Sequence, residues 1–156
     1  MLNPILVVED DENDIFFLTY AMEKVGLENP LQIASDGREA VDYFKGHGKF
    51  ADRLQFPLPC LVMLDLKLPY LRGLDVLKWM RQEAQLTTIV IVFSSSENEA
   101  DIEAAYRLGA NAYLVKPTET SKLVEMAKAM KDFWLAHNRA PQLPKNSSVS
   151  SLHRAV

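Results

Sequence analysis

The sequence of 156 residues contains a single cysteine, Cys60, so it cannot form an internal disulfide bond. Cys60 stands at the head of an apolar run, which favours a packed small hydrophobic residue over a reactive thiol. A protein without disulfides fits a reducing compartment, and we expect it in the cytoplasm.

The sequence also lacks long apolar runs and an excess of basic charge. No run approaches the roughly 20 apolar residues of a membrane-spanning helix. The first apolar run soon meets Glu9, Asp10 and Asp11, without a basic lead-in or a small-residue cleavage site, so we expect no ordinary signal peptide. With 17 Lys and Arg residues against 21 Asp and Glu residues, the net charge is −4, and we expect neither nucleic acid nor a membrane as a partner.

The chain has enough apolar residues, 48%, to bury the core of one domain, and it is too short for two. Beyond His137 the composition changes to prolines, serines and basic residues, without an acid. We therefore expect one folded domain over residues 1–137 and a disordered polar tail over residues 138–156.

Five short apolar runs, typical of strands, alternate with five segments whose apolar residues recur at helical spacing. Helices should begin after residues 11, 37 and 73, cover residues 97–108, and begin again at residues 118–121. Residues 46–59, with two glycines and two prolines, should form a long loop with room for a helical turn. The expected strands are residues 4–8, 31–34, 60–65, 88–93 and 112–115.

This alternation predicts a doubly wound α/β fold, with a five-stranded parallel sheet and five helices on its two faces. The order of the strands cannot be derived from the pattern itself. The flavodoxin-like order 2-1-3-4-5 is the common choice for five units, and it brings the carboxyl ends of the first, third, fourth and fifth strands around one crevice.

Polar side chains follow these four strands at the point where each strand ends. Several carboxylates in one small site would repel one another without a hard cation among them, and oxygen ligands with room for water and phosphate suit Mg²⁺. A carboxylate can also accept a phosphoryl group as a nucleophile, while a hydroxyl and an ammonium hold the transferred oxygens. The candidate residues are Glu9, Asp10, Asp11, Asp65, Ser94, Ser95 and Lys116.

Most of these residues also have a structural explanation when each is taken alone. The acids of residues 9–14 could favour the positive end of the first helix, Ser94 could cap a helix, and Lys116 could be an ordinary solvated lysine. Asp65 is harder to explain in this way, because it ends an apolar strand. The arrival of all of them at one edge of the expected sheet favours a phosphoryl-transfer site.

The motifs around these residues resemble those of the receiver domains of two-component response regulators. The resemblance covers residues 5–134 and is carried by Val-Val-Glu-Asp-Asp at 7–11, Leu-Asp-Leu-Lys-Leu-Pro at 64–69, Gly73, Ser94-Ser95 and Tyr-Leu-Val-Lys-Pro at 113–117. It implies that Asp65 is the phosphoacceptor. It also implies that Mg²⁺ is held by Glu9, Asp10, Asp65 and the backbone carbonyl of Lys67.

The same resemblance implies roles for residues around the phosphoryl group. Ser94 and Lys116 would stabilise the phosphoryl oxygens, and Ser94 and Tyr113 would form a switch that changes conformation on phosphorylation. The bond between Lys116 and Pro117 would be a cis peptide bond, a geometry that proline makes accessible.

The single-domain layout and the long loop at residues 46–59 look like the small response regulators associated with bacterial phytochromes. This likeness implies a sensor histidine kinase, such as a bacterial phytochrome, as the phosphoryl donor, and a downstream protein as the target. It also implies a homodimer through the fourth helix, the fifth strand and the fifth helix, where Met126, Phe133 and Trp134 would add apolar surface. A wide but ordinary core stripe explains the same three residues equally well.

We therefore expect a single-domain response regulator that signals by phosphorylation-dependent protein-protein interaction and is not an enzyme in the usual sense. One alternative is a receiver fold that binds partners without phosphorylation. A phosphatase with a nucleophilic aspartate is disfavoured, because Lys67 stands where a second acid is needed. A flavodoxin-type cofactor carrier is disfavoured, because the acids of residues 9–11 would repel its phosphate.

Overall fold

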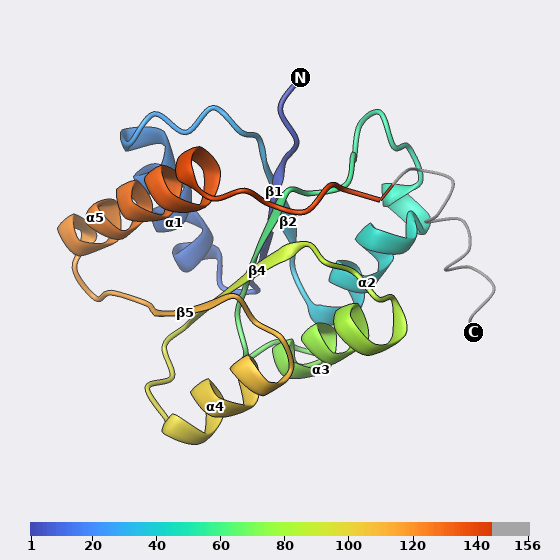
Figure 1. Cartoon of the computed structure of the whole chain (residues 1–156). Coiled ribbons are helices and arrows are strands. Elements are labelled where there is room, and N and C mark those ends of the chain that lie inside the picture. The colour runs from blue at the N-terminus through green and yellow to red at the C-terminus, as the bar shows by residue number, and fades with distance from the viewer. Residues whose placement is uncertain (145–156) are drawn as a thin grey trace.

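The short apolar runs form a five-stranded parallel sheet in the computed structural model, which describes residues 1–144 (Figure 1). The order β2-β1-β3-β4-β5 confirms the predicted flavodoxin-like, doubly wound fold. The strands are β1 (Ile5–Val8), β2 (Leu31–Ala34), β3 (Leu61–Leu64), β4 (Ile89–Ser94) and β5 (Ala112–Val115).

The three central strands run in phase, so their carboxyl ends lie at one edge of the sheet. Leu64 of β3 pairs with Val8 of β1 on one side and with Val92 of β4 on the other. All residues of these strands are buried, whereas β2 and β5 at the edges are mostly half-buried. Burial on both faces explains why the central strands appear in the sequence as unbroken apolar runs.

The helices divide between the two faces of the sheet (Figure 1). On one face, α1 (Glu12–Lys24) packs against α5 (Thr120–Met130). On the other face, α3 packs between α2 and α4. These three helices are α2 (Gly37–Lys45), α3 (Gly73–Lys78) and α4 (Glu99–Arg107), and α3 and α5 continue as the π-helical segments η2 (Trp79–Glu83) and η3 (Lys131–His137).

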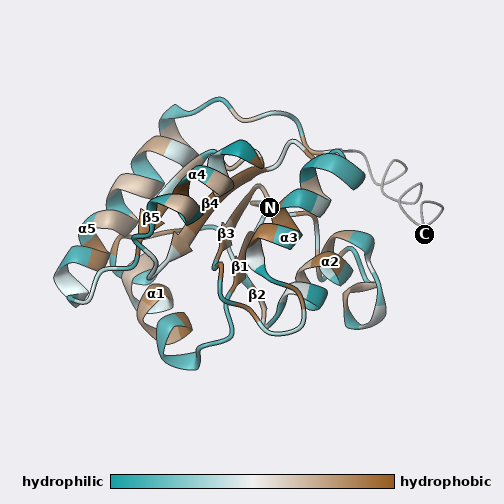
Figure 2. Ribbon diagram, turned by 90° about the horizontal axis from the view of Figure 1, so that it is seen from below, coloured by the Kyte–Doolittle hydropathy of each residue, from teal (hydrophilic) through white to brown (hydrophobic). Residues whose placement is uncertain are grey.

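Each face of the sheet has its own apolar cluster, visible as the brown strands between the helices in Figure 2. Along β1, Leu6 and Val8 point toward α2 and α3, while Ile5 and Val7 point toward α1 and α5. This alternation follows from the period of two in a strand. The core therefore consists of two layers that share the sheet.

The long loop at residues 46–59 is anchored by aromatic contacts. It contains the predicted helical turn, the 3₁₀ segment η1 (Gly48–Phe50). The ring centroid of Tyr43 in α2 lies 5.0 Å from that of Phe50 and 6.1 Å from that of Phe56. The Tyr43 hydroxyl donates a hydrogen bond of 2.8 Å to the carbonyl of Pro57. The loop is thus part of the core despite its irregular sequence.

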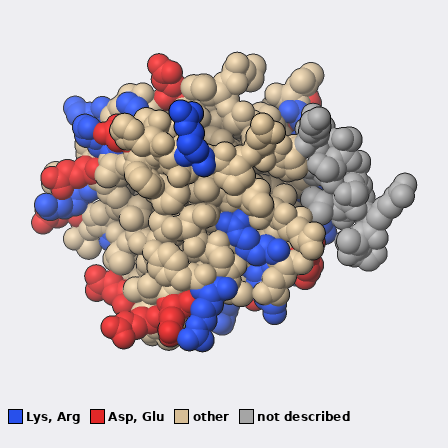
Figure 3. All heavy atoms as spheres, viewed as in Figure 1, with Lys and Arg blue, Asp and Glu red and all other residues tan. Residues whose placement is uncertain are grey.

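The last helical segment ends at His137, where the sequence predicts the end of the folded domain. Residues 138–144 have no regular secondary structure, and the rest of the predicted tail, residues 145–156, lies outside the described residues. Within residues 1–144, no helix is long and apolar enough to cross a membrane. On the face shown in Figure 3 most of the surface is uncharged, acidic side chains lie toward the edges, and Lys and Arg side chains lie both at the edges and near the centre.

Gly73, the first residue of α3, lies directly against the backbone at the end of β3. A Cβ atom at position 73 would lie 2.1 Å from the carbonyl oxygen of Asp65 and 2.7 Å from the Cα of Leu66. The Gly73 N–H also donates a hydrogen bond of 3.0 Å to the carbonyl of Leu66. The position of Asp65 therefore depends on the absence of a side chain at residue 73.

We predict that Gly73→Ala lowers the free energy of unfolding by about 2–3 kcal/mol, because the added methyl group displaces packed backbone. Helix propensity alone predicts a gain of about 1 kcal/mol instead. Urea denaturation measures the difference. Gly48→Ala is the control, since nothing lies within 4 Å of a Cβ there and only its φ of +58° opposes alanine. A Gly73→Ala protein as stable as the parent would contradict this close contact.

Candidate functional site

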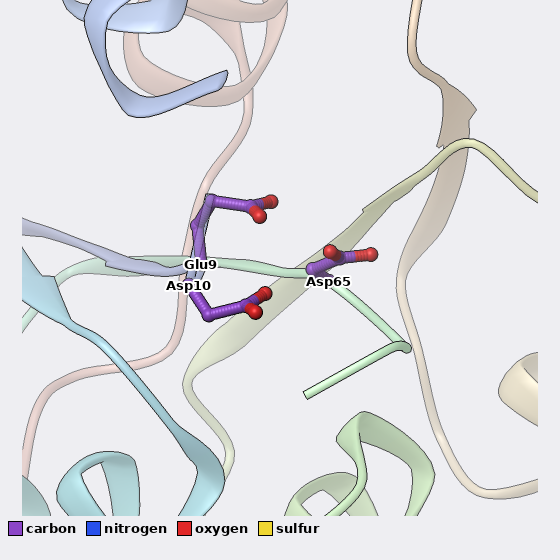
Figure 4. A group of neighbouring side chains, drawn as sticks. All are labelled: Glu9, Asp10 and Asp65. Carbon is purple, nitrogen blue, oxygen red and sulfur yellow. The ribbon is translucent and has the colours of Figure 1, made fainter. Parts of the chain in front are cut away.

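Three acidic side chains meet at the carboxyl edge of β1 and β3 (Figure 4). Glu9 and Asp10 follow β1, Asp65 follows β3, and each offers a carboxylate oxygen within 4.8 Å of the others. Glu9 is 4% exposed and Asp65 is 6% exposed, whereas Asp10 is open to solvent. The structure thus brings together the three side chains that the sequence suggested as metal ligands.

This set of donors fits a hard divalent cation. It consists of carboxylate oxygens, which suit Mg²⁺, and the exposed Asp10 leaves one side open to water. A hollow of about 700 Å³ next to the cluster is lined by Asp10 and by Lys67, among others. The role of the Lys67 carbonyl as a further ligand stays a prediction.

Lys116 reaches the acidic cluster from the end of β5. Its Nζ lies 2.6 Å from Oε2 of Glu9 and 3.2 Å from Oδ2 of Asp65, and its side chain is 12% exposed. Burial lowers the pKa of Lys116, but the hydrogen bonds to Asp14 and Glu9, together with the negative charges of Asp65 and Glu9, outweigh burial and raise the pKa. A charged ammonium therefore stands beside the expected phosphoacceptor.

Asp14 is a member of the site that the sequence did not predict. Its Oδ2 lies 2.8 Å from Nζ of Lys116. The sequence explained this acid only by the positive end of the first helix. The contact with Lys116 arises because α1 packs against α5, which starts just beyond Lys116 in the chain. Only the packing of these two helices identifies Asp14 as a member of the site, and a short sequence motif does not reveal how helices pack.

Asp11 has a structural role, although the sequence grouped it with the acids of the site. It is the N-cap of α1, and its carboxylate accepts hydrogen bonds from the N–H groups of Asn13 and Asp14 at 2.8 and 3.1 Å. Ser95 is exposed and lines a second hollow, of about 380 Å³, together with Asp14 and Lys116.

Ser94 and Tyr113 are connected through Ser96. Ser94 is fully buried at the end of β4, and its hydroxyl accepts a hydrogen bond of 3.2 Å from the N–H of Ser96. The Tyr113 hydroxyl donates a hydrogen bond of 2.8 Å to the carbonyl of Ser96. The Ser96 hydroxyl in turn donates to Asp101 of α4 at 2.6 Å. The predicted roles of Ser94 and Tyr113 stay predictions, but a hydrogen-bonded path joins them.

The predicted cis peptide bond before Pro117 is wrong. Among residues 1–144, no peptide bond is cis. The trans form of a bond to proline is favoured intrinsically by about 0.5–1 kcal/mol. With the trans bond, Lys116 already reaches Glu9 and Asp65.

The burial of Glu9 changes its affinity for a proton. Burial raises the pKa of Glu9 to about 7, although the hydrogen bond from Lys116 acts in the opposite direction. Between pH values of about 4.5 and 7, the folded protein therefore holds a proton that the unfolded chain has released.

We predict that the free energy of unfolding of the metal-free protein falls as the pH rises through this range, by up to about 3 kcal/mol at about 1.4 kcal/mol per pKa unit. Urea denaturation in EDTA at pH values across the range measures the slope. The Glu9→Gln variant, which cannot titrate at this position, should lose this contribution. Parallel pH profiles of the two proteins would show that Glu9 titrates normally.

Comparison with known proteins identifies a family and several similar structures. Residues 5–128 match the response regulator receiver domain family. Response regulator Rcp1 of Synechocystis sp. is 33% identical over 132 residues, which cover 84% of this chain and 88% of Rcp1. The crystal structure of Mn²⁺-bound Rcp1 has a TM-score of 0.80 at 31% identity and covers 90% of this chain and 100% of that one.

Two further solved structures are also similar. Response regulator RPA3017, in red light signalling of R. palustris, has a TM-score of 0.85 at 37% identity and covers 90% of this chain and 99% of that chain. The bacteriophytochrome response regulator RtBRR has a TM-score of 0.72 at 38% identity and covers 99% of this chain and 90% of that chain.

These likenesses confirm the expected resemblance to response regulators associated with phytochromes. A receiver domain is a signalling module and not a classical enzyme. The acidic group of Glu9, Asp10 and Asp65 is consistent with the phosphoacceptor site of such a domain. The chain belongs to the family of response regulator receiver domains.

Proposed function

We propose that the protein is a single-domain response regulator that accepts a phosphoryl group on Asp65 from a sensor histidine kinase. The observation that carries this proposal is the setting of Asp65. Its Oδ1 accepts a hydrogen bond of 2.8 Å from the N–H of Leu66, while its Oδ2 lies 3.2 Å from Nζ of Lys116. A buried carboxylate held in this way, beside two further carboxylates, is oriented for nucleophilic attack.

In the transfer, a carboxylate oxygen of Asp65 attacks the phosphorus of a phosphohistidine. An oxygen–phosphorus bond forms while the nitrogen–phosphorus bond breaks, and the electron pair of that bond stays on the imidazole nitrogen. The donor is thus left as a histidine, and Asp65 becomes a mixed anhydride. Alignment of the two reacting groups supplies much of the acceleration in this kind of step.

The neighbouring groups hold the charge of the transferred phosphoryl group. Mg²⁺, held by Glu9, Asp10 and Asp65 with the carbonyl of Lys67, would neutralise part of the charge on its oxygens. Lys116 supplies an ammonium next to Asp65. The Ser94 hydroxyl, which accepts from Ser96, also has a proton with which to bind a phosphoryl oxygen.

The hydrogen bonds that connect Ser94 with Tyr113 would transmit the effect of phosphorylation to the surface. When the Ser94 hydroxyl turns toward a phosphoryl oxygen, the N–H of Ser96 loses its acceptor. Ser96 is also hydrogen-bonded to Tyr113 of β5 and to Asp101 near the start of α4. A change in the position of Ser96 would therefore move the Tyr113 ring and the start of α4 together. A target that binds one arrangement better than the other would then read the phosphorylation state.

The likeness to the bacteriophytochrome response regulator RtBRR supports a sensor kinase of the bacterial phytochrome type as the donor, and the likeness to RPA3017, in red light signalling, agrees with it. The target of the phosphorylated protein is a further protein. We place the exchange in the cytoplasm, where the half-buried Cys60 stays reduced; burial raises the pKa of this thiol and makes it less reactive.

A homodimer through α4, β5 and α5 is part of the same proposal. Met126 and Trp134 pack against the apolar cluster of α1 and α5, which favours the core explanation for these two residues. Phe133 is 53% exposed, and its ring lies 4.9 Å from that of Trp134, centroid to centroid. Phe133 is therefore the residue of the three that offers apolar surface to a second copy.

We predict that the parent protein incorporates a phosphoryl group from acetyl phosphate with Mg²⁺ and that Asp65→Asn does not, because the neutral amide oxygen is a much weaker nucleophile than a carboxylate oxygen. Phosphate-affinity electrophoresis measures the incorporation, and EDTA should abolish it. Asp42→Asn, a change of the same kind in α2 and away from the site, should behave as the parent.

Incorporation by Asp65→Asn at the rate of the parent would assign the acceptor elsewhere. A parent protein that takes no phosphoryl group from acetyl phosphate or from a histidine kinase, yet binds a protein target, would favour the alternative, a binding module without phosphorylation.

A further inference from the structure

Among residues 1–144, Lys116 has three carboxylate partners, and two of these belong to the candidate metal site. Glu9 and Asp65 each offer an oxygen to the acidic cluster and also bind the ammonium of Lys116. Asp14 binds Lys116 at 2.8 Å but lies outside that cluster. The proposed function uses Lys116 and the cluster and assigns no role to Asp14.

The two shared carboxylates create a competition. A cation that takes oxygens of Glu9 and Asp65 draws on the same negative charge that holds Lys116, at 2.6 and 3.2 Å. Like charges repel, so the ammonium has to move away from Glu9 when a divalent cation enters. Without another partner, it would either obstruct the cation or leave the neighbourhood of Asp65.

Asp14 can serve as this other partner of the Lys116 ammonium. Its own N–H is held by the Asp11 cap at 3.1 Å, so its backbone is fixed by α1 and not by Lys116. Its side chain is 42% exposed, against 5% for Glu9 and 8% for Asp65. A half-exposed pair remains partly hydrated and is weaker than a buried one, so Asp14 can hold the ammonium and still release it to a phosphoryl oxygen.

The surroundings leave room for this movement. Asp14 and Lys116 together line the hollow of about 380 Å³ on the side of α1 and α5. The ring of Phe93 lies in the same wall, with its centroid 5.7 Å from Nζ of Lys116, and offers a second favourable contact for the ammonium.

We propose that Asp14 is a positioning residue that retains the Lys116 ammonium beside Asp65 while Glu9 and Asp65 serve a divalent cation. Asp14 acts through Lys116 and touches neither the cation nor the phosphoryl group. Asp14 makes cation binding more favourable, because its carboxylate retains the ammonium that the cation displaces from Glu9. This inference rests on the proposed function, in which the cation and Lys116 act together.

The experiment is a titration of the full chain with Mg²⁺ alone. Amide NMR chemical shifts monitor the binding and also report whether each variant is folded. We expect Asp14→Asn to raise the dissociation constant for Mg²⁺ about tenfold, or about 1.4 kcal/mol, because the ammonium that three carboxylates share in the free protein would then have no carboxylate outside the cation site. Asp14→Glu, which keeps the carboxylate, should bind Mg²⁺ more tightly than Asp14→Asn.

Two comparisons separate positioning from the loss of a negative charge. Glu12→Gln removes a carboxylate from the same first turn of α1, at an exposed position, and should stay within about twofold of the parent. In a Lys116→Met background, Asp14→Asn should also change the dissociation constant by less than about twofold, since no ammonium remains to be held.

An Asp14→Asn effect of equal size with and without Lys116 would overturn the proposal, and so would an unchanged dissociation constant in Asp14→Asn. A parent protein that binds no Mg²⁺ would overturn it together with the metal site. The titration needs no phosphoryl donor. A parent that binds Mg²⁺ but accepts no phosphoryl group would therefore refute the proposed function and still leave the Asp14 comparison decisive for the positioning of Lys116.

Discussion

Repulsion among carboxylates is the constraint on which the functional edge of this protein depends. Glu9, Asp10 and Asp65 lie within 4.8 Å of one another, and two of them are almost fully buried. Lys116 compensates part of this charge from a separate strand, and the raised pKa of Glu9 shows that burial still opposes full ionisation. The site is a balance of opposite charges, so a cation or anion that enters it changes this balance.

The scaffold makes this balance possible by bringing distant residues together. Lys116 is 107 residues from Glu9 in the sequence and 51 from Asp65, yet it contacts both. The in-phase pairing of β1, β3 and β4 aligns the strand ends, and Gly73 lets α3 begin against the backbone of Asp65. Short strands and tight loops thus hold the charged groups on rigid backbone.

The sequence predicted the residues that sit at strand ends, because strands buried on both faces are visible as apolar runs and the polar residues that end them are exceptions. It did not predict Asp14, whose contact with Lys116 depends on how two helices pack. It grouped Asp11 with the site, since spacing alone does not separate a helix cap from a ligand. The cis bond before Pro117 came from family likeness, and the structure has a trans bond.

The path from Ser94 through Ser96 to Tyr113 consists of single hydrogen bonds. Each contributes about 0.5–1.5 kcal/mol in net terms, so two arrangements of this path differ by a few kcal/mol at most. Under the proposed function, both arrangements are then populated in every phosphorylation state, and the modification changes their ratio. The output of such a protein is graded: the concentration of the target and the level of phosphorylation would both set how many molecules are engaged at a given moment.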